Sequence, residues 1–137
     1  MENLKEKLYT VGEVAKMLNL SNYTVRYYTN LGLVPYIKRD ANNNRLFNEE
    51  DIYWLKGFIK LKKCGMSVKN MQKYCRLCLQ GGDTFNERYA MICECRKKAQ
   101  EKFENARQIL DFAENKLQHY NDIKAGKVKD NTNLLFR

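Results

Sequence analysis

The chain has 137 residues, of which 30 % are charged and 12 % aromatic, a composition typical of a folded protein and not of a disordered one. Its net charge is +9, and residues 1–80 carry 14 lysines and arginines against 7 acidic residues, which favours a polyanion as partner over a generic basic surface. Because no apolar run could cross a bilayer and the N-terminus lacks a signal-peptide core, we expect a cytoplasmic protein without a membrane partner.

The first two predicted helices lie close together in the sequence. Thr10 and Glu13 have the spacing of a capping box, in which each side chain accepts a hydrogen bond from the backbone amide of the other residue. Ser21 can cap a second helix that runs to about Asn30, and Gly32 stops it. Two short helices joined by a turn of about three residues form a helix-turn-helix unit. The apolar face of the first helix consists of Val11, Val14, Ala15 and Leu18.

The next segment, residues 33–47, has two short stretches of strand character around a tip of Asp and Asn residues. Asn tolerates positive φ better than other non-glycine residues, so a β-hairpin is predicted, with an irregular loop as the alternative. Asn48 then caps a third helix with an acidic first turn, where the helix dipole favours negative charge. Ser67 caps a fourth helix, which ends at the glycine pair 81–82.

From residue 85 onward, apolar residues recur in alternating steps of four and three, which is typical of a coiled coil. Such a helix would be roughly 54 Å long, too long to bury its apolar stripe on a small head. We therefore expect a partner helix, and a second copy of the chain is favoured over an intramolecular contact. The stripe, called the seam below, consists of Phe85, Tyr89, Ile92, Ala99, Phe103, Ala106, Leu110, Ala113, Leu117 and Tyr120, with Arg96 in its one gap.

These pieces together resemble the MerR family of transcriptional regulators. The resemblance rests on YTVGEVAKMLNLSNYTVRYYTNLGLV and RLFNEEDIYWLKGFIKLKKCGMSVKNMQ, which cover about the first 75 residues. It implies a mainly α fold: a winged helix-turn-helix head over residues 1–80 and an antiparallel coiled-coil dimerisation helix over 81–122. Residues 123–137 are expected to form a flexible tail, in which an apolar trio at 134–136 could pack.

The resemblance also implies a function. Members of this family bind a pseudo-palindromic operator in double-stranded DNA as homodimers, within an over-long promoter spacer. They bend and untwist the spacer so that both promoter elements come into register for RNA polymerase. The elastic cost of several kcal/mol is offset by contacts to the DNA backbone.

The second helix is expected to place its N-terminal half in the major groove, where side chains meet base edges. The fork of Arg26 suits either a guanine edge or a phosphate, and this choice stays open. By similarity to the family, Thr10 and Tyr27 are expected to position phosphates. The candidates in this half of the helix are Asn22, Tyr23, Thr24 and Arg26.

In the hairpin, which would be the wing, Arg39 and Arg45 are expected to contact the sugar-phosphate backbone, with Lys38 nearby. The family usually has Gly-Tyr-Arg where this chain has Asn43-Asn44-Arg45. The arginine contact is therefore expected to persist, whereas a tyrosine contact at position 44 is not.

Five cysteines without an export signal are expected to be reduced thiols. The pairs Cys75/Cys78 and Cys93/Cys95 could together hold zinc, but thiols two residues apart on a helix point apart. We therefore expect no metal and no cofactor. The chain is most similar to a short subgroup that responds to aldehyde, nitrosative or thiol stress, but Lys60 occupies the position of that subgroup's cysteine. The candidates for a thiol sensor are Cys64, Cys75 and Cys78, with inert packing as the favoured alternative; the effector is unknown.

Two other classes of protein are alternatives to this interpretation. An excisionase-like architectural DNA-binding protein can share a winged head, but it usually lacks a long dimerising helix. An enzyme is not expected, because the single histidine, His119, has only Asp122 nearby in the sequence and no nucleophile or phosphate-binding glycine loop accompanies it.

Overall fold

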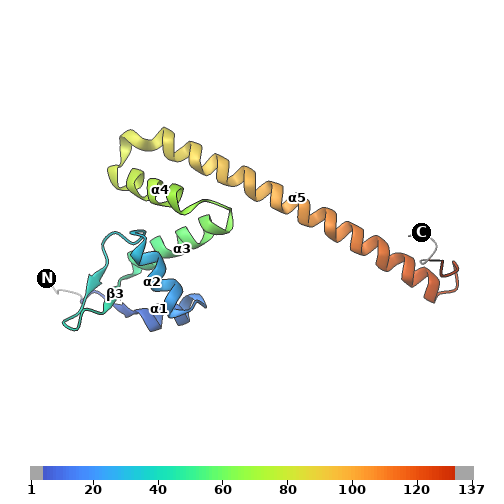
Figure 1. Cartoon of the computed structure of the whole chain (residues 1–137), viewed down its shortest axis with the longest axis horizontal. Coiled ribbons are helices and arrows are strands. Elements are labelled where there is room, and N and C mark those ends of the chain that lie inside the picture. Colours follow the sequence, from blue (N-terminus) through green and yellow to red (C-terminus); the bar gives the residue numbers. More distant parts are fainter. Residues whose placement is uncertain (1–4, 132–137) are drawn as a thin grey trace. The chain divides into compact units, whose positions relative to one another are not determined.

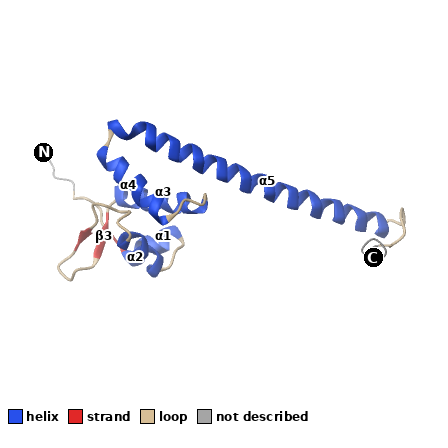
Figure 2. Cartoon of the chain, turned by 45° about the horizontal axis from the view of Figure 1, so that its top comes forward, coloured by secondary structure: helices blue, strands red, loops and turns tan. Residues whose placement is uncertain are grey.

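A computed structural model describes residues 5–131 of the chain and is mainly helical, with one small antiparallel sheet, as predicted (Figures 1 and 2). It divides into two compact units: the first reaches Lys98 and the second begins at Ala99, within the last helix. The elements are β1 (Tyr9–Thr10), α1 (Val11–Leu18), α2 (Asn22–Asn30), β2 (Lys38–Arg39), β3 (Arg45–Phe47), α3 (Glu49–Lys63), α4 (Val68–Gln80), the short 3-10 helix η1 (Gly82–Thr84) and α5 (Phe85–Lys124).

The caps predicted from the sequence define the helix boundaries. The Thr10 hydroxyl accepts from the Glu13 amide and the Glu13 carboxylate accepts from the Thr10 amide, both at 3.1 Å, which completes the capping box of α1. Ser21 and Ser67 cap α2 and α4 from one side only: each hydroxyl accepts a hydrogen bond from the backbone amide three residues later. α3 also has a full capping box, because the Asp51 carboxylate accepts from the Asn48 amide at 3.0 Å. Only the Asn48 half of this capping box was predicted from the sequence.

The predicted hairpin is present, and its tip contains Asn43 with a φ of 65°. The sheet also contains β1, a strand outside the hairpin that was not predicted. Tyr9 pairs with Phe47 and Thr10 with Leu46, so β3 is the central strand and receives β1 on one edge and β2 on the other. A two-residue strand is too short for a periodic signal, and the sequence pointed to Thr10 as a helix cap and a phosphate contact, not as part of a strand. β1 therefore ties the start of α1 to the wing.

The core of the head lies where β3 meets the helices. Val14 of α1, Val25 of α2 and Leu55 of α3 are fully buried together with Phe47 of β3. Residues two apart on a strand share a face, so Arg45 lies on the same face of β3 as Phe47. Figure 2 shows the strands beside α1 and α2. The face of β3 that packs into the core through Phe47 therefore also carries Arg45, which lies two residues nearer to the hairpin tip.

Helix α5 runs without interruption over 40 residues. Its seam is exposed in the single chain, with Phe103 at 70 %, Leu110 at 55 % and Leu117 at 61 % of their full accessibility. Two apolar residues beside the seam, Ile109 and Phe112, are exposed as well. This helix continues to Lys124, and the apolar trio at 134–136 lies outside the described residues. None of the helices described is long and apolar enough to cross a membrane.

The first prediction concerns Phe47, whose ring is completely buried. Phe47→Ala should lower the free energy of unfolding by about 3–5 kcal/mol, because it removes a ring from a packed core. Tyr36→Ala removes a ring that is 65 % exposed and should change the stability by less than about 0.5 kcal/mol. Urea unfolding followed by circular dichroism measures both variants. Equal losses in the two variants would contradict the anchoring of β3 by Phe47.

Candidate nucleic-acid interface

One of the residues predicted on the N-terminal half of α2 also takes part in the helix cap. The Ser21 hydroxyl accepts from the Thr24 amide at 3.0 Å and lies 2.8 Å from the Thr24 hydroxyl, so Thr24 belongs to the helix cap. Asn22 and Arg26 are exposed, and Tyr23 is 75 % exposed. The ring of Tyr23 stacks on that of Tyr27, with centroids 6.4 Å apart. α2 therefore presents an amide, a guanidinium and a paired aromatic surface to solvent.

The predicted phosphate contact at Thr10 is compatible with its role as a cap. The Thr10 oxygen accepts one hydrogen bond from the Glu13 amide, which leaves the hydroxyl proton able to donate to a phosphate. Thr10 is exposed and Tyr27 is half-buried. The ring of Tyr27 also contacts that of the buried Tyr28 edge-on, with centroids 5.9 Å apart. The core thus limits the positions that the Tyr27 hydroxyl can take.

The two wing arginines lie opposite each other, because Arg39 of β2 and Arg45 of β3 are partners in the strand register. Arg45 donates from Nη2 to the side-chain oxygen of Asn30, at the end of α2, at 2.5 Å. Arg39 donates from Nη1 to the carbonyl oxygen of Asn43 at 2.9 Å. Partial burial and the positive charges of Arg39 and Arg26 lower the pKa of Arg45. Sequence reasoning missed Asn30, which lies 15 residues from Arg45 and in a different element.

Asn44 stands where the family usually has a tyrosine, and it stabilises the hairpin tip. Its backbone amide donates to the Asp40 carboxylate at 2.8 Å, and its side-chain amide lies 3.3 Å from the same group. These hydrogen bonds from backbone and side chain, together with one from the Asn42 amide, lower the pKa of Asp40. The wing tip is therefore a turn organised around one carboxylate.

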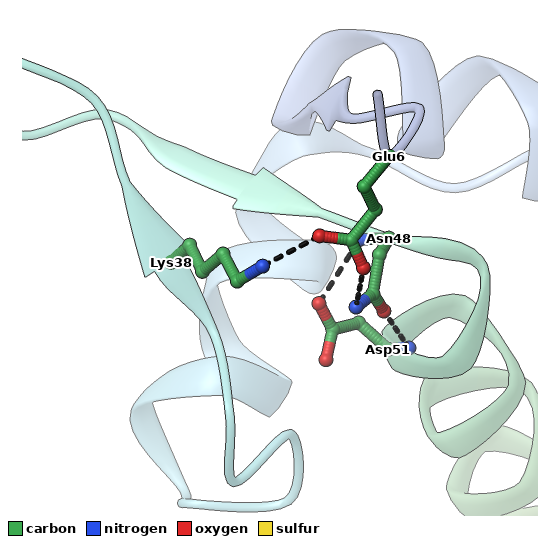
Figure 3. A network of polar contacts seen from close by, with 4 residues as sticks. All are labelled: Glu6, Lys38, Asn48 and Asp51. Carbon is green, nitrogen blue, oxygen red and sulfur yellow. Dashed lines mark hydrogen bonds and ion pairs between the residues drawn. The ribbon is translucent and has the colours of Figure 1, made fainter. Parts of the chain in front are cut away.

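Lys38 differs from the two arginines because its charge already has a partner (Figure 3). Its ammonium group forms an ion pair with Glu6 at 2.5 Å, and the other Glu6 oxygen accepts from the Asn48 side-chain amide at 2.6 Å. The bond to Lys38, followed by the bond to Asn48, lowers the pKa of Glu6; the same pair raises the pKa of Lys38. Asp51 lies beside this network, and burial raises the pKa of its carboxyl group. The sequence contains no local signal for Glu6, which lies 32 residues from Lys38.

The cysteines are free thiols in different surroundings. Cys75 is buried, its Sγ lies 3.7 Å from the Gly32 carbonyl oxygen, and burial raises the pKa of its thiol. Cys64 and Cys78 are half-buried, and Cys93 and Cys95 are exposed and buried respectively. Within residues 5–131, no three cysteine, histidine or acidic side chains gather as a metal site.

An open cavity of about 460 Å³ lies within the first unit, between α3, α4 and the beginning of α5. Cys78 is its one thiol. Burial, and then the neighbouring Cys78, raise the pKa of the Tyr74 hydroxyl in the same wall. The aromatic and apolar part of the lining consists of Tyr53, Trp54, Phe58, Leu61, Tyr74 and Ile92.

Comparisons with known proteins agree on the family. A family profile described as MerR HTH family regulatory protein matches residues 9–78, about half of the chain. An HTH-type transcriptional regulator of Haemophilus influenzae is 34 % identical over 122 residues, which are 88 % of this chain and 90 % of the relative. The HTH-type transcriptional regulator AdhR of Bacillus subtilis is 34 % identical over 64 % of this chain and 63 % of its own length.

A solved structure extends the likeness to three dimensions. It is described as HiNmlR, a MerR family regulator lacking the sensor domain, bound to promoter DNA. It superposes with a TM-score of 0.76 at 33 % identity and covers 87 % of this chain and 94 % of its own. The likeness therefore includes the head and much of α5.

The second prediction concerns the Glu6 network. The folded pKa of Glu6 is lower than its ordinary value of 4.5, so its ion pair stabilises the fold above about pH 4.5. That contribution disappears as the pH falls through the lowered folded pKa. The wild type should therefore be more stable than Glu6→Gln at pH 7, and the difference should vanish in acid. Urea unfolding between pH 3 and 7 measures this difference.

The matched control is Glu101→Gln, which removes an exposed carboxylate from α5. Its stability at pH 7 should match that of the wild type, because surface substitutions usually have little effect on stability. A Glu6→Gln difference that stays constant from pH 3 to 7 would show that the carboxylate charge does not hold Lys38.

Proposed function

The chain belongs to the MerR family and is a DNA-binding transcriptional regulator, and on that premise we propose that it acts on a promoter operator as a homodimer. The observation that carries the proposal is the exposed apolar seam of α5. Isolated apolar side chains on a surface are ordinary, but a heptad stripe of this length favours a partner helix.

Charge supports pairing through α5. Residues 81–137 carry 11 basic and 9 acidic residues, whereas residues 1–80 carry 14 and 7. Two copies of the near-neutral segment can approach with little repulsion, and two copies of the basic segment cannot. We propose the antiparallel arrangement, residues 81–122 forming the dimerisation helix and residues 1–80 the DNA-binding head.

Two heads related by a two-fold axis would bind a pseudo-palindromic operator. In each head, α2 would enter a major groove while the wing contacts the backbone. Lys38 can join these contacts by exchanging Glu6 for a phosphate. Bending and untwisting of the promoter spacer would then bring the promoter elements into register for RNA polymerase. Because its target is promoter DNA, we place the regulator in the bacterial cytoplasm.

Among residues 5–131, no arrangement of side chains favours a second function. The Asp122 carboxylate accepts a hydrogen bond from the Gln118 side chain at 2.9 Å, and we assign no enzymatic role to His119. An excisionase-like protein does not need the long seam that this chain carries. If a thiol responds to a chemical signal, Cys64 and Cys78 suit this better than Cys75, because they are half-buried whereas Cys75 is buried and burial raises the pKa of its thiol.

The third prediction tests the dimer. Leu110→Glu places a charge in the seam and should convert the dimer to a monomer, because burying an unpaired carboxylate is costly. Gln108→Glu places the same charge on the outward face of the same helix and should leave the dimer intact. Sedimentation velocity at micromolar protein measures both variants.

The same two variants test the function. On a duplex selected from a random pool by the wild type, Leu110→Glu should lose at least tenfold in affinity, because two heads no longer bind together. Gln108→Glu should bind like the wild type. A monomeric wild type, or a Leu110→Glu variant that remains dimeric, would contradict the proposed use of the seam.

A further inference from the structure

The open cavity between α3, α4 and the beginning of α5 lies apart from the DNA contacts proposed above, because none of its lining residues is among them (Figure 1). Its volume of about 460 Å³ is within the range of about 300–1,000 Å³ that small-molecule sites occupy. Such sites combine a mainly apolar and aromatic wall with a few polar groups that fix the orientation of the ligand. The lining of this cavity has the same combination.

Aromatic rings form one wall of the cavity. The ring of Trp54 stacks on that of Phe58, with centroids 5.9 Å apart and planes inclined by 19°. Phe58 also meets Tyr74 of α4 edge-on, with centroids 6.3 Å apart. Phe58 is buried in the core, whereas Trp54 and Tyr74 are half-buried. Because flat rings held in this way offer a rigid face for stacking, the wall favours an aromatic ligand over a flexible aliphatic chain.

Gly57 leaves the α3 side of the cavity without a side chain. Glycine inside a helix is less favourable than alanine, so a glycine there usually reflects a need for space. A Cβ added at Gly57 would meet no packing neighbour within 4 Å, so no close approach of another element requires glycine at this position. The missing side chain therefore adds only to the space of the cavity.

The charged residues of the lining, Lys56 and Lys60, are both basic. They are four residues apart on α3, so they lie on one face of that helix. Within residues 5–131, neither lysine forms an ion pair with a carboxylate, and no acidic side chain lines the cavity. The Tyr74 hydroxyl, whose pKa is raised first by burial and then by Cys78, stays protonated and can donate a hydrogen bond as well. The polar part of the lining therefore suits an anion.

We propose that this cavity binds a small aromatic carboxylate, whose ring packs against Trp54 and whose carboxylate pairs with Lys56 and Lys60. The proposal goes beyond the proposed function and concerns binding alone, so it is tested without DNA. Ile92 lines the cavity and also belongs to the seam, which makes a second copy of the chain the competing occupant. The residues of the seam carry no carboxylate for the two lysines, and this favours the anion.

The test titrates the wild-type protein with 4-phenylbutanoate, with its neutral amide and with the corresponding cationic amine. Trp54 is the only tryptophan of the chain, so a ligand in the cavity should change the tryptophan fluorescence, and isothermal titration calorimetry gives the affinity. The carboxylate should bind about tenfold more tightly than the amide, the size expected for one charged hydrogen bond, and the amine should bind most weakly. Equal affinities for the carboxylate and the amide would overturn the proposal.

Two variants locate the binding, each with a matched control. Gly57→Leu fills the cavity wall and should bind 4-phenylbutanoate at least tenfold more weakly, whereas Lys62→Leu adds the same side chain to α3 outside the cavity and should bind like the wild type. Lys56→Gln combined with Lys60→Gln should lose about tenfold for the carboxylate and nothing for the amide. Lys62→Gln combined with Lys69→Gln removes the same charge from exposed positions outside the cavity and should change neither affinity.

The remaining outcomes decide between the occupants. A wild type that responds to none of the ligands overturns the proposal, and carboxylate binding by the Leu110→Glu monomer alone would assign the cavity to the second copy instead. Octanoate binding more tightly than 4-phenylbutanoate would overturn the aromatic class of ligand. Should Gly57→Leu fail to fold, unchanged carboxylate binding by the variant without Lys56 and Lys60 overturns the proposal by itself.

Discussion

The three residues of β3 impose the constraint on which the interface depends. Phe47 is completely buried against the helices, and the pleat of the strand puts Arg45 on the same face two residues earlier. The position of the wing relative to α2 is therefore set by core packing and not by the hairpin itself. The hydrogen bond from Arg45 to Asn30 adds a polar contact between the same strand and the end of α2. β1 adds hydrogen bonding to the other edge of β3 and ties the cap of α1 to the same strand.

The positive charges of the wing fall into two kinds. Lys38 is paired with Glu6, and this pair also reaches Asn48 at the beginning of α3, so in the free protein it stabilises the head. Among residues 5–131, Arg39 and Arg45 donate to the neutral oxygens of Asn43 and Asn30 and form no ion pair with a carboxylate. Lys38 thus stabilises the folded head through its ion pair, whereas the charges of the two arginines can interact with a polyanion. The lysine can contribute to DNA binding only by giving up a contact.

The structure also shows which features a sequence can predict. Caps such as Thr10 with Glu13 involve residues three apart, and the seam of α5 repeats every seven residues, so both appear as local patterns. Strand β1, the Glu6–Lys38 pair and the Arg45–Asn30 bond join residues 15 to 38 positions apart, and they arise only once the core has brought the elements together. Thr24 shows the converse case, because a residue predicted at the interface serves the helix cap as well.

The central claim is that two heads, held by paired α5 helices, bind one operator through α2 and the wing together. Hydroxyl-radical footprinting of the wild type on a selected duplex tests it most directly, because it maps the protected backbone at single-nucleotide resolution. The account predicts two equivalent protected regions related by a two-fold axis, with centres one helical turn or a whole multiple of it apart. A single protected region, or two regions without that symmetry, would contradict it.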